Sequence, residues 1–210
     1  PTLDECLTGL ASAIAARTLG LVPEFIEGKV SANLMKNGMG VTVPGTGMVG
    51  LPIAAAVGAL GGDPDAGLEV LKNLTPDIVE AGKKMLADKK VEVDIAEVDN
   101  ILYAEARLAN GKDWARVCIA NSHTNVVLIE KNGETLFKAD TSSNNTEAGY
   151  SLAGATAHSV YDFATTAPFT DIAFILEAAK LNAQLSTEGL RGEYGLHIGA
   201  TLRRQIAGGL

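Results

Sequence analysis

The sequence has few cysteines, and the two that are present exclude some classes of site. Cys6 and Cys118 lie far apart, without the Cys-x-x-Cys spacing that metal sites use. Such sparse cysteine usage fits a reducing compartment, so we expect a cytoplasmic protein with no metal ligands in this chain. The first residues also lack a basic segment followed by an apolar core, so no secretory leader is expected.

The sequence also lacks a long hydrophobic run and an excess of basic residues. Its most apolar stretch, residues 49–60, is shorter than the roughly 18 residues of a membrane span and is broken by Gly50 and Pro52. We therefore expect a buried helix there and no membrane partner. The formal net charge is -8, whereas binding a nucleic acid requires a surplus of Lys and Arg on one face. No nucleic-acid partner is expected.

Apolar residues recur every three or four positions in several segments, which is the pattern of amphipathic helices. Thr75, Pro76 and Asp77 form a helix start, because threonine caps free amides, proline needs no donor there, and aspartate opposes the positive helix end. An Ala-rich helix is expected to begin near Leu51. The other expected helices cover residues 7–19, 76–88, 169–183 and 196–206.

Strands are indicated where apolar residues occupy every second position. Runs of this kind within residues 91–108 are followed by two more around the polar segment 121–125. The pair Asn132-Gly133 has the residues that a tight hairpin turn requires. We therefore expect an antiparallel meander over residues 91–138.

The remaining segments complete the predicted architecture. Two shorter strands within residues 25–43 are expected around a polar loop at 33–38, and residues 140–149 form a turn-prone loop before a helical remainder. These elements predict an α+β fold with a mixed, mainly antiparallel sheet of about five to six strands flanked by helices. At this length we expect a single domain over residues 1–210.

A glycine-rich loop is the first candidate binding site. Gly45, Thr46 and Gly47 lie between an expected strand and the helix near Leu51. A loop that opens a helix can point free backbone amides at an anion, and the carboxylate of a substrate would suit that place. The alternative is that the glycines only permit a sharp turn between strand and helix.

A polar corner between two apolar strands is the second candidate. It consists of Ser122, His123, Thr124 and Asn125. The imidazole of His123 can donate to or accept from a carboxylate or amine near neutral pH. A structural histidine that binds loop amides is the alternative.

A third candidate lies before Gly38. Asn33, Lys36 and Asn37 provide one cation and two amides that could bind the head group of an α-amino acid. A solvated turn explains the same residues equally well.

Several blocks of the sequence match a known pattern in order. They are residues 33–52, residues 61–72, Asn121 to Asn125, Ala179 to Asn182, and Gly195 to Gly199. Through these blocks the chain resembles the L-cysteine desulfidase family, which is similar to the alpha part of iron-sulfur L-serine dehydratases. The resemblance covers roughly Phe25 to the end of the chain.

The resemblance implies a carbon-sulfur or carbon-oxygen lyase of amino-acid catabolism. Family members convert L-cysteine to pyruvate, ammonia and sulfide with a 4Fe-4S cluster, whose open iron position can act as a Lewis acid. The cluster cysteines lie mainly in a carboxyl-terminal half that is missing here. We therefore expect the cluster only in the full-length protein, no cofactor in this chain, and no activity of this chain alone.

The expected partners follow from the same resemblance. They are a small amino-acid substrate, the missing carboxyl-terminal half and, as an option, a second copy in a homodimer. Cys6 is the only catalytic candidate of this chain, although its surroundings depart from the Gly-Cys-Thr-Glu-Pro segment that family members carry near the first helix. The alternative function is a non-catalytic amino-acid-binding or assembly module.

Overall fold

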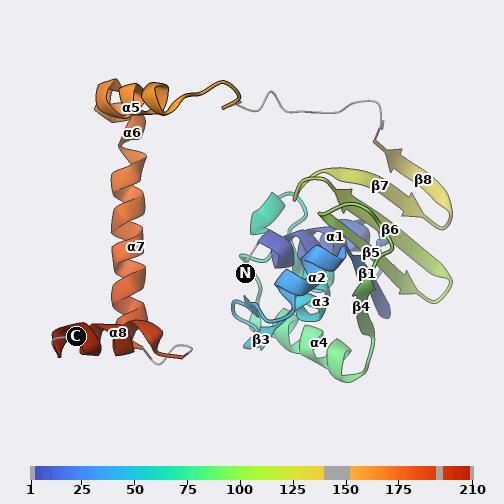
Figure 1. Cartoon of the computed structure of the whole chain (residues 1–210). Coiled ribbons are helices and arrows are strands. Elements are labelled where there is room, and N and C mark those ends of the chain that lie inside the picture. The colour runs from blue at the N-terminus through green and yellow to red at the C-terminus, as the bar shows by residue number, and fades with distance from the viewer. Residues whose placement is uncertain (1–2, 140–151, 193–195, 209–210) are drawn as a thin grey trace. The chain divides into compact units, whose positions relative to one another are not determined.

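The computed structural model describes residues 3–139, 152–192 and 196–208. The chain divides into two compact units, Pro1–Asn144 (unit 1) and Asn145–Leu210 (unit 2), which are treated separately below. Figure 1 gives the labels of their elements. The expectation of a single domain over residues 1–210 stays a prediction.

Unit 1 is built around a six-stranded mixed sheet, which confirms the predicted α+β class. One strand pair, β1 with β4, is parallel, and the other neighbouring pairs are antiparallel. In spatial order the strands are β4 (Val91–Ile95), β1 (Phe25–Val30), β5 (Tyr103–Asn110), β6 (Asp113–Ala120), β7 (Val126–Lys131) and β8 (Glu134–Lys138).

The predicted meander over residues 91–138 is wrong at its first strand. Strand β4 does not pair with β5, because β1 lies between them and pairs with both. The alternation of Val91 and Val93 with acidic residues shows which face of the strand is buried. It carries no information about which strand lies alongside, so the sequence left the partner of β4 undetermined.

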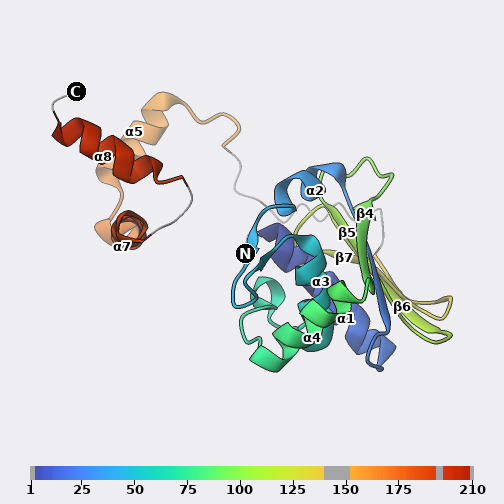
Figure 2. The same cartoon turned by 90° about the horizontal axis from the view of Figure 1, so that it is seen from below.

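Helices cover one face of this sheet, as both views show (Figure 1 and Figure 2). The central one is α1 (Leu3–Leu19), which is buried along most of its length and packs on β5, β6 and α3. Helix α3 (Leu51–Gly61) is the expected buried helix. The layer also contains α2 (Ala32–Gly38), the short 3-10 helix η1 (Gly67–Glu69) and α4 (Pro76–Ala87).

The polar segment before Gly38 is a helix, which corrects the predicted loop. Ser31 caps α2, because its Oγ accepts a hydrogen bond from Leu34 N at 3.4 Å. The same hydroxyl donates to Ile101 O at 2.7 Å and so ties the start of α2 to the chain before β5. A cap that depends on a distant carbonyl cannot be recognised from local spacing.

Two local predictions are confirmed. Asn132 and Gly133 form the tight turn between β7 and β8 and have φ values of 50° and 88°, a conformation that Asn and Gly tolerate best. Thr75 caps α4 by accepting from Ile78 N at 3.4 Å, with Pro76 in the first turn. The turn at Asn132 and the cap at Thr75 were therefore readable from the sequence.

Unit 2 is helical in the residues that the structure describes. The helix expected after Pro168 is present in two parts, and the expected final helix is present as well. The elements are α5 (Ala157–Thr166), α6 (Phe169–Ile172), α7 (Phe174–Arg191) and α8 (Ile198–Ala207). None of these described helices contains a buried residue. The loop expected at 140–149 lies outside the described residues.

Across residues 3–139, 152–192 and 196–208, no helix combines the length and the apolar character that crossing a membrane would demand.

The contact between α1 and α3 generates a stability prediction. A Cβ atom on Gly58 would lie 2.5 Å from Gly9 O and 2.7 Å from Gly9 Cα, and both of those atoms belong to the backbone. Because the backbone cannot move aside cheaply, we expect Gly58→Ala to lower the free energy of unfolding by about 1–3 kcal/mol in urea titrations followed by circular dichroism. A Cβ on the exposed Gly40 meets no atom within 4 Å, so the control Gly40→Ala should change stability by less than about 0.5 kcal/mol. Equal effects of the two changes would contradict this packing.

Candidate functional site

The glycine-rich loop is the turn of a small hairpin. Strands β2 (Thr42–Val43) and β3 (Met48–Val49) pair around it, so the expected direct passage from strand to helix is wrong. Gly45 and Gly47 have φ values of 81° and 67°, which only glycine adopts readily. These glycines are therefore needed for the turn itself.

Thr46, between the two glycines, is committed to the same hairpin. Its side chain is buried, and its hydroxyl donates to Val43 O at 2.6 Å and accepts from Met48 N at 3.0 Å. Its backbone amide also donates to Val43 O, at 3.2 Å. The threonine thus has a structural role, and anion binding by Gly45, Thr46 and Gly47 stays a prediction.

The third candidate group lies on helix α2. Asn33, Lys36 and Asn37 are all exposed. Lys36 is in the last turn, where a cation stabilises the negative end of the helix dipole. Binding of an amino-acid head group by these three residues also stays a prediction.

The polar corner forms the loop between β6 and β7. Asn125 holds it closed, because its Nδ2 donates to Ala120 O at 3.0 Å and its carbonyl accepts from Ala120 N at 3.1 Å. Ser122 and Thr124 are exposed, whereas His123 is half-buried. His123 Nε2 lies 3.6 Å from Asp4 Oδ1 in the first turn of α1. The structure therefore joins the corner to the start of α1, a contact that the sequence did not predict.

The first turn of α1 contains the other candidate, Cys6. Glu5 is completely buried beside it, and Cys6 is 7% exposed. Burial raises the pKa of the Cys6 thiol, and the carboxylate of Glu5 raises it further. A thiol with a raised pKa is protonated at neutral pH and is a poor nucleophile. The geometry thus favours a structural role for Cys6, and the catalytic role stays a prediction.

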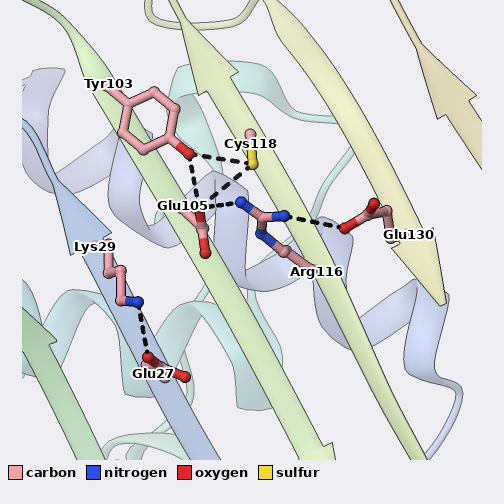
Figure 3. Close-up of polar contacts among 7 residues, drawn as sticks. All are labelled: Glu27, Lys29, Tyr103, Glu105, Arg116, Cys118 and Glu130. Atoms are coloured by element: carbon pink, nitrogen blue, oxygen red, sulfur yellow. Dashed lines mark hydrogen bonds and ion pairs between the residues drawn. The ribbon is translucent and has the colours of Figure 1, made fainter. Parts of the chain in front are cut away.

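A second polar cluster lies on the face of the sheet opposite the helices (Figure 3). Its centre is Glu105 on β5, whose side chain is 11% exposed. Glu105 Oε2 accepts hydrogen bonds from Tyr103 Oη at 2.6 Å and from Arg116 Nη2 at 2.7 Å. Arg116 also donates through Nη1 to Glu130 Oε2 at 3.1 Å. The cluster therefore links β5, β6 and β7 by side chains as well as by the backbone.

Cys118 is part of the same cluster. Its Sγ lies 3.7 Å from Glu105 Oε2 and 3.4 Å from Tyr103 Oη. Burial raises the pKa of the Cys118 thiol. Burial also raises the pKa of Tyr103, and its hydrogen bonds to Cys118 and Glu105 raise it further. Both groups are consequently protonated at neutral pH.

The pKa of Glu105 is shifted in the opposite direction. Burial alone would raise the pKa of its carboxyl group, but the hydrogen bonds from Arg116 and Tyr103 outweigh burial and lower the pKa. The charged Glu105 is therefore the form that the fold stabilises. Tyr103 and Glu105 alternate with Ala104 and Ala106 in the sequence, so the outward face was readable. The pairing with Arg116 was not, because it depends on the register of β5 and β6.

The described part of the chain contains no cluster of side chains that would form a metal site. There, no set of three or more His, Cys, Asp and Glu side chains could hold a metal ion. The 4Fe-4S cluster expected in the longer protein would need ligands from elsewhere.

The cluster around Glu105 generates a prediction of pH dependence. Because the folded state lowers the pKa of Glu105, its contribution to stability is present above the unfolded pKa of about 4.3 and is lost as the pH falls through the folded pKa. Glu105→Gln should cost about 1–2 kcal/mol at pH 7, less than for a fully buried pair, because the Arg116 side chain is 33% exposed. Urea unfolding from pH 7 to pH 3 should show this difference shrinking. The control is Glu134→Gln on the exposed strand β8, and a cost for Glu105→Gln that does not change with pH would refute the assignment.

Comparison with known proteins gives strong sequence matches. The chain is 64% identical over 201 residues to a UPF0597 protein of Chromobacterium violaceum, with 96% of this chain and 47% of that protein covered. A UPF0597 protein of Yersinia enterocolitica is 60% identical, covering 96% of this chain and 47% of the relative. A third, from Dichelobacter nodosus, is 55% identical and covers 99% of this chain and 48% of the relative. The chain thus spans about half the length of the curated relatives it matches.

These relatives overturn the resemblance given above. They match nearly the whole chain under the name UPF0597, and none of the three is named as an L-cysteine desulfidase or an L-serine dehydratase. The desulfidase, lyase and iron-sulfur assignments drawn from that resemblance are therefore corrected. No family model matches the chain, and no solved structure matches it. What the comparisons support is similarity to UPF0597 proteins, whose printed names state no activity.

Proposed function

We propose that the chain is an assembly module whose unit 2 packs the apolar faces of its helices against another protein surface. The observation that carries this proposal is that, within unit 2, the described helices α5 to α8 do not bury any of one another's residues. Isolated helices shorter than about 12–15 residues, such as α5 and α8, are marginal in water and depend on the packing of an apolar face. Burying one Leu, Ile or Phe side chain contributes about 1.5–3 kcal/mol, so covering several would stabilise unit 2 substantially.

Helix α7 supports the proposal through the pattern of its side chains. Phe174, Leu181 and Leu185 recur at helical spacing and are 70%, 56% and 72% exposed. The polar side contains two exposed ion pairs, Lys180 with Glu177 and Arg191 with Glu188, each at 3.5 Å. A helix that is polar on one side and apolar on the other is typical of packing against a partner.

Helix α8 has the same character. Ile198, Leu202 and Ile206 follow each other at intervals of four residues and are 62%, 53% and 73% exposed. In a monomeric soluble protein, apolar side chains grouped in this way mark an interaction site. The uncovered faces of α7 and α8 together favour a function in association.

The cytoplasm is the compartment that we propose. Cys6 and Cys118 are both free and both buried. Free thiols are usual where glutathione keeps cysteines reduced.

Hydrogen exchange in the full-length Chromobacterium violaceum relative tests the assembly function. The segments that match α7 and α8 should exchange much more slowly than unstructured peptides, because a covering surface suppresses local opening. The segment that matches α3, which is buried in unit 1, provides the protected reference. Exchange of the α7 and α8 segments at the rate of an unstructured chain would rule out the proposal.

A second candidate function, the binding of a small zwitterion such as an α-amino acid, is favoured by one contact. His123 and Asp4 meet at 3.6 Å beside the exposed hydroxyls of Ser122 and Thr124. An imidazole and hydroxyls can donate to a carboxylate, and the carboxylate of Asp4 can accept from an ammonium group. The junction thus offers partners for both charges of an amino acid.

Isothermal titration of the chain with L-serine and L-cysteine tests this candidate. His123→Ala should weaken binding about tenfold or more, since a hydrogen bond to a charged group contributes about 1.5–3 kcal/mol. His158→Ala is the matched control, because His158 is exposed on α5 and pairs only locally with Asp162 at 3.2 Å. Absence of binding, or equal weakening by both variants, would exclude the junction as an amino-acid site.

A further inference from the structure

We infer that the surface covering α7 and α8 belongs to the same polypeptide, namely the half of the longer protein that lies outside this chain. This inference rests on the assembly function proposed above and identifies its partner. The matched relatives contain this chain as 47–48% of their length, so about half of each relative remains as a partner in the same molecule. The matches extend over 96–99% of this chain, so they take in helices of unit 2 as well as unit 1.

Covalent connection favours this partner over a separate molecule. Association of two free proteins costs an estimated 4–15 kcal/mol in lost translational and rotational freedom. A partner in the same polypeptide avoids most of that cost, because the linker gives it a high effective concentration.

The charged residues of α8 indicate which side chains the partner surface should carry. Arg203 and Arg204 lie in the second half of α8, which contains no acidic residue. Within the described part of unit 2, neither arginine forms an ion pair with a carboxylate, and Arg204 Nη2 only reaches Thr201 Oγ1 at 3.4 Å. The two arginines are therefore available to carboxylates of a partner.

Apolar side chains lie beside these arginines. Leu190, at the end of α7, lines a hollow with Ala200 and Ala207 of α8, and Arg203 and Arg204 line the same hollow. A complementary segment would place apolar side chains on this floor and carboxylates opposite the guanidinium groups. The partner segment in the other half of the protein should therefore be apolar with flanking Asp or Glu residues.

Hydrogen exchange separates this inference from the function on which it rests. The chain alone should be monomeric by light scattering, with α7 and α8 unprotected at every concentration. Protection of both helices in the monomeric chain alone would identify unit 1 as their cover and would overturn this inference. The same chain joined to the remaining half of the Chromobacterium violaceum relative should protect both helices, and dilution should not remove the protection. Protection in the chain alone that rises with concentration would identify a second copy as the partner, which overturns this inference and retains the assembly function. Lack of protection in both proteins would overturn this inference and the assembly function as well.

Two neighbouring substitutions in the joined protein provide the matched control. Leu185→Glu introduces a charge on the apolar side of α7, whereas Gln184→Glu introduces the same side chain on the polar side. Loss of about 1.5–3 kcal/mol of apolar burial should speed exchange of α7 about tenfold or more in Leu185→Glu. Gln184→Glu should leave the exchange rate within about twofold. Unchanged exchange in Leu185→Glu, with α1 still protected in both variants, would contradict the inferred cover.

Discussion

The close approach of α1 to α3 is the contact on which the arrangement of unit 1 depends. Gly58 faces the backbone of Gly9 without room for a side chain, so α1 is held between α3 and the sheet. Because α1 is fixed there, its first turn is placed at the loop between β6 and β7, where Asp4 meets His123. The position of the candidate corner is thus a consequence of helix packing and not of the loop sequence alone.

The two faces of the sheet are stabilised by different interactions. On the helix side, small and branched apolar residues such as Ala104, Ala106 and Val117 fill the space beneath α1 and have no polar group to satisfy. On the other side, Glu105 and Arg116 form an ion pair and remain partly in contact with water. An antiparallel sheet commonly has one such polar face. The cluster is sufficiently explained by this structural role, so it is not required as a reaction site.

The sequence predicted local structure well and long-range structure poorly. The turn at Asn132, the cap at Thr75 and the buried helix after Gly50 follow from residue chemistry that acts over a few positions. The insertion of β1 between β4 and β5 does not, because alternation specifies a face and leaves the neighbour open. Among the candidate site residues, the sequence predicted that His123 lies in a polar corner between two strands. It did not predict the contact with Asp4, because the two residues are far apart in the sequence. The lyase assignment was wrong for another reason, since it rested on a resemblance that the relatives do not support.

The position of β1 between β4 and β5 has a consequence for how the polypeptide acquires its structure during synthesis. Phe25 pairs with Ala109 and Ile26 with Val91, so β1 cannot join the sheet until a large part of unit 1 has left the ribosome. Closing so long a loop slows folding, because entropy is lost before the contacts are gained. Until β4 and β5 have been synthesised, both edges of β1 are unpaired, and the nascent chain is then most exposed to misfolding and to recognition by chaperones.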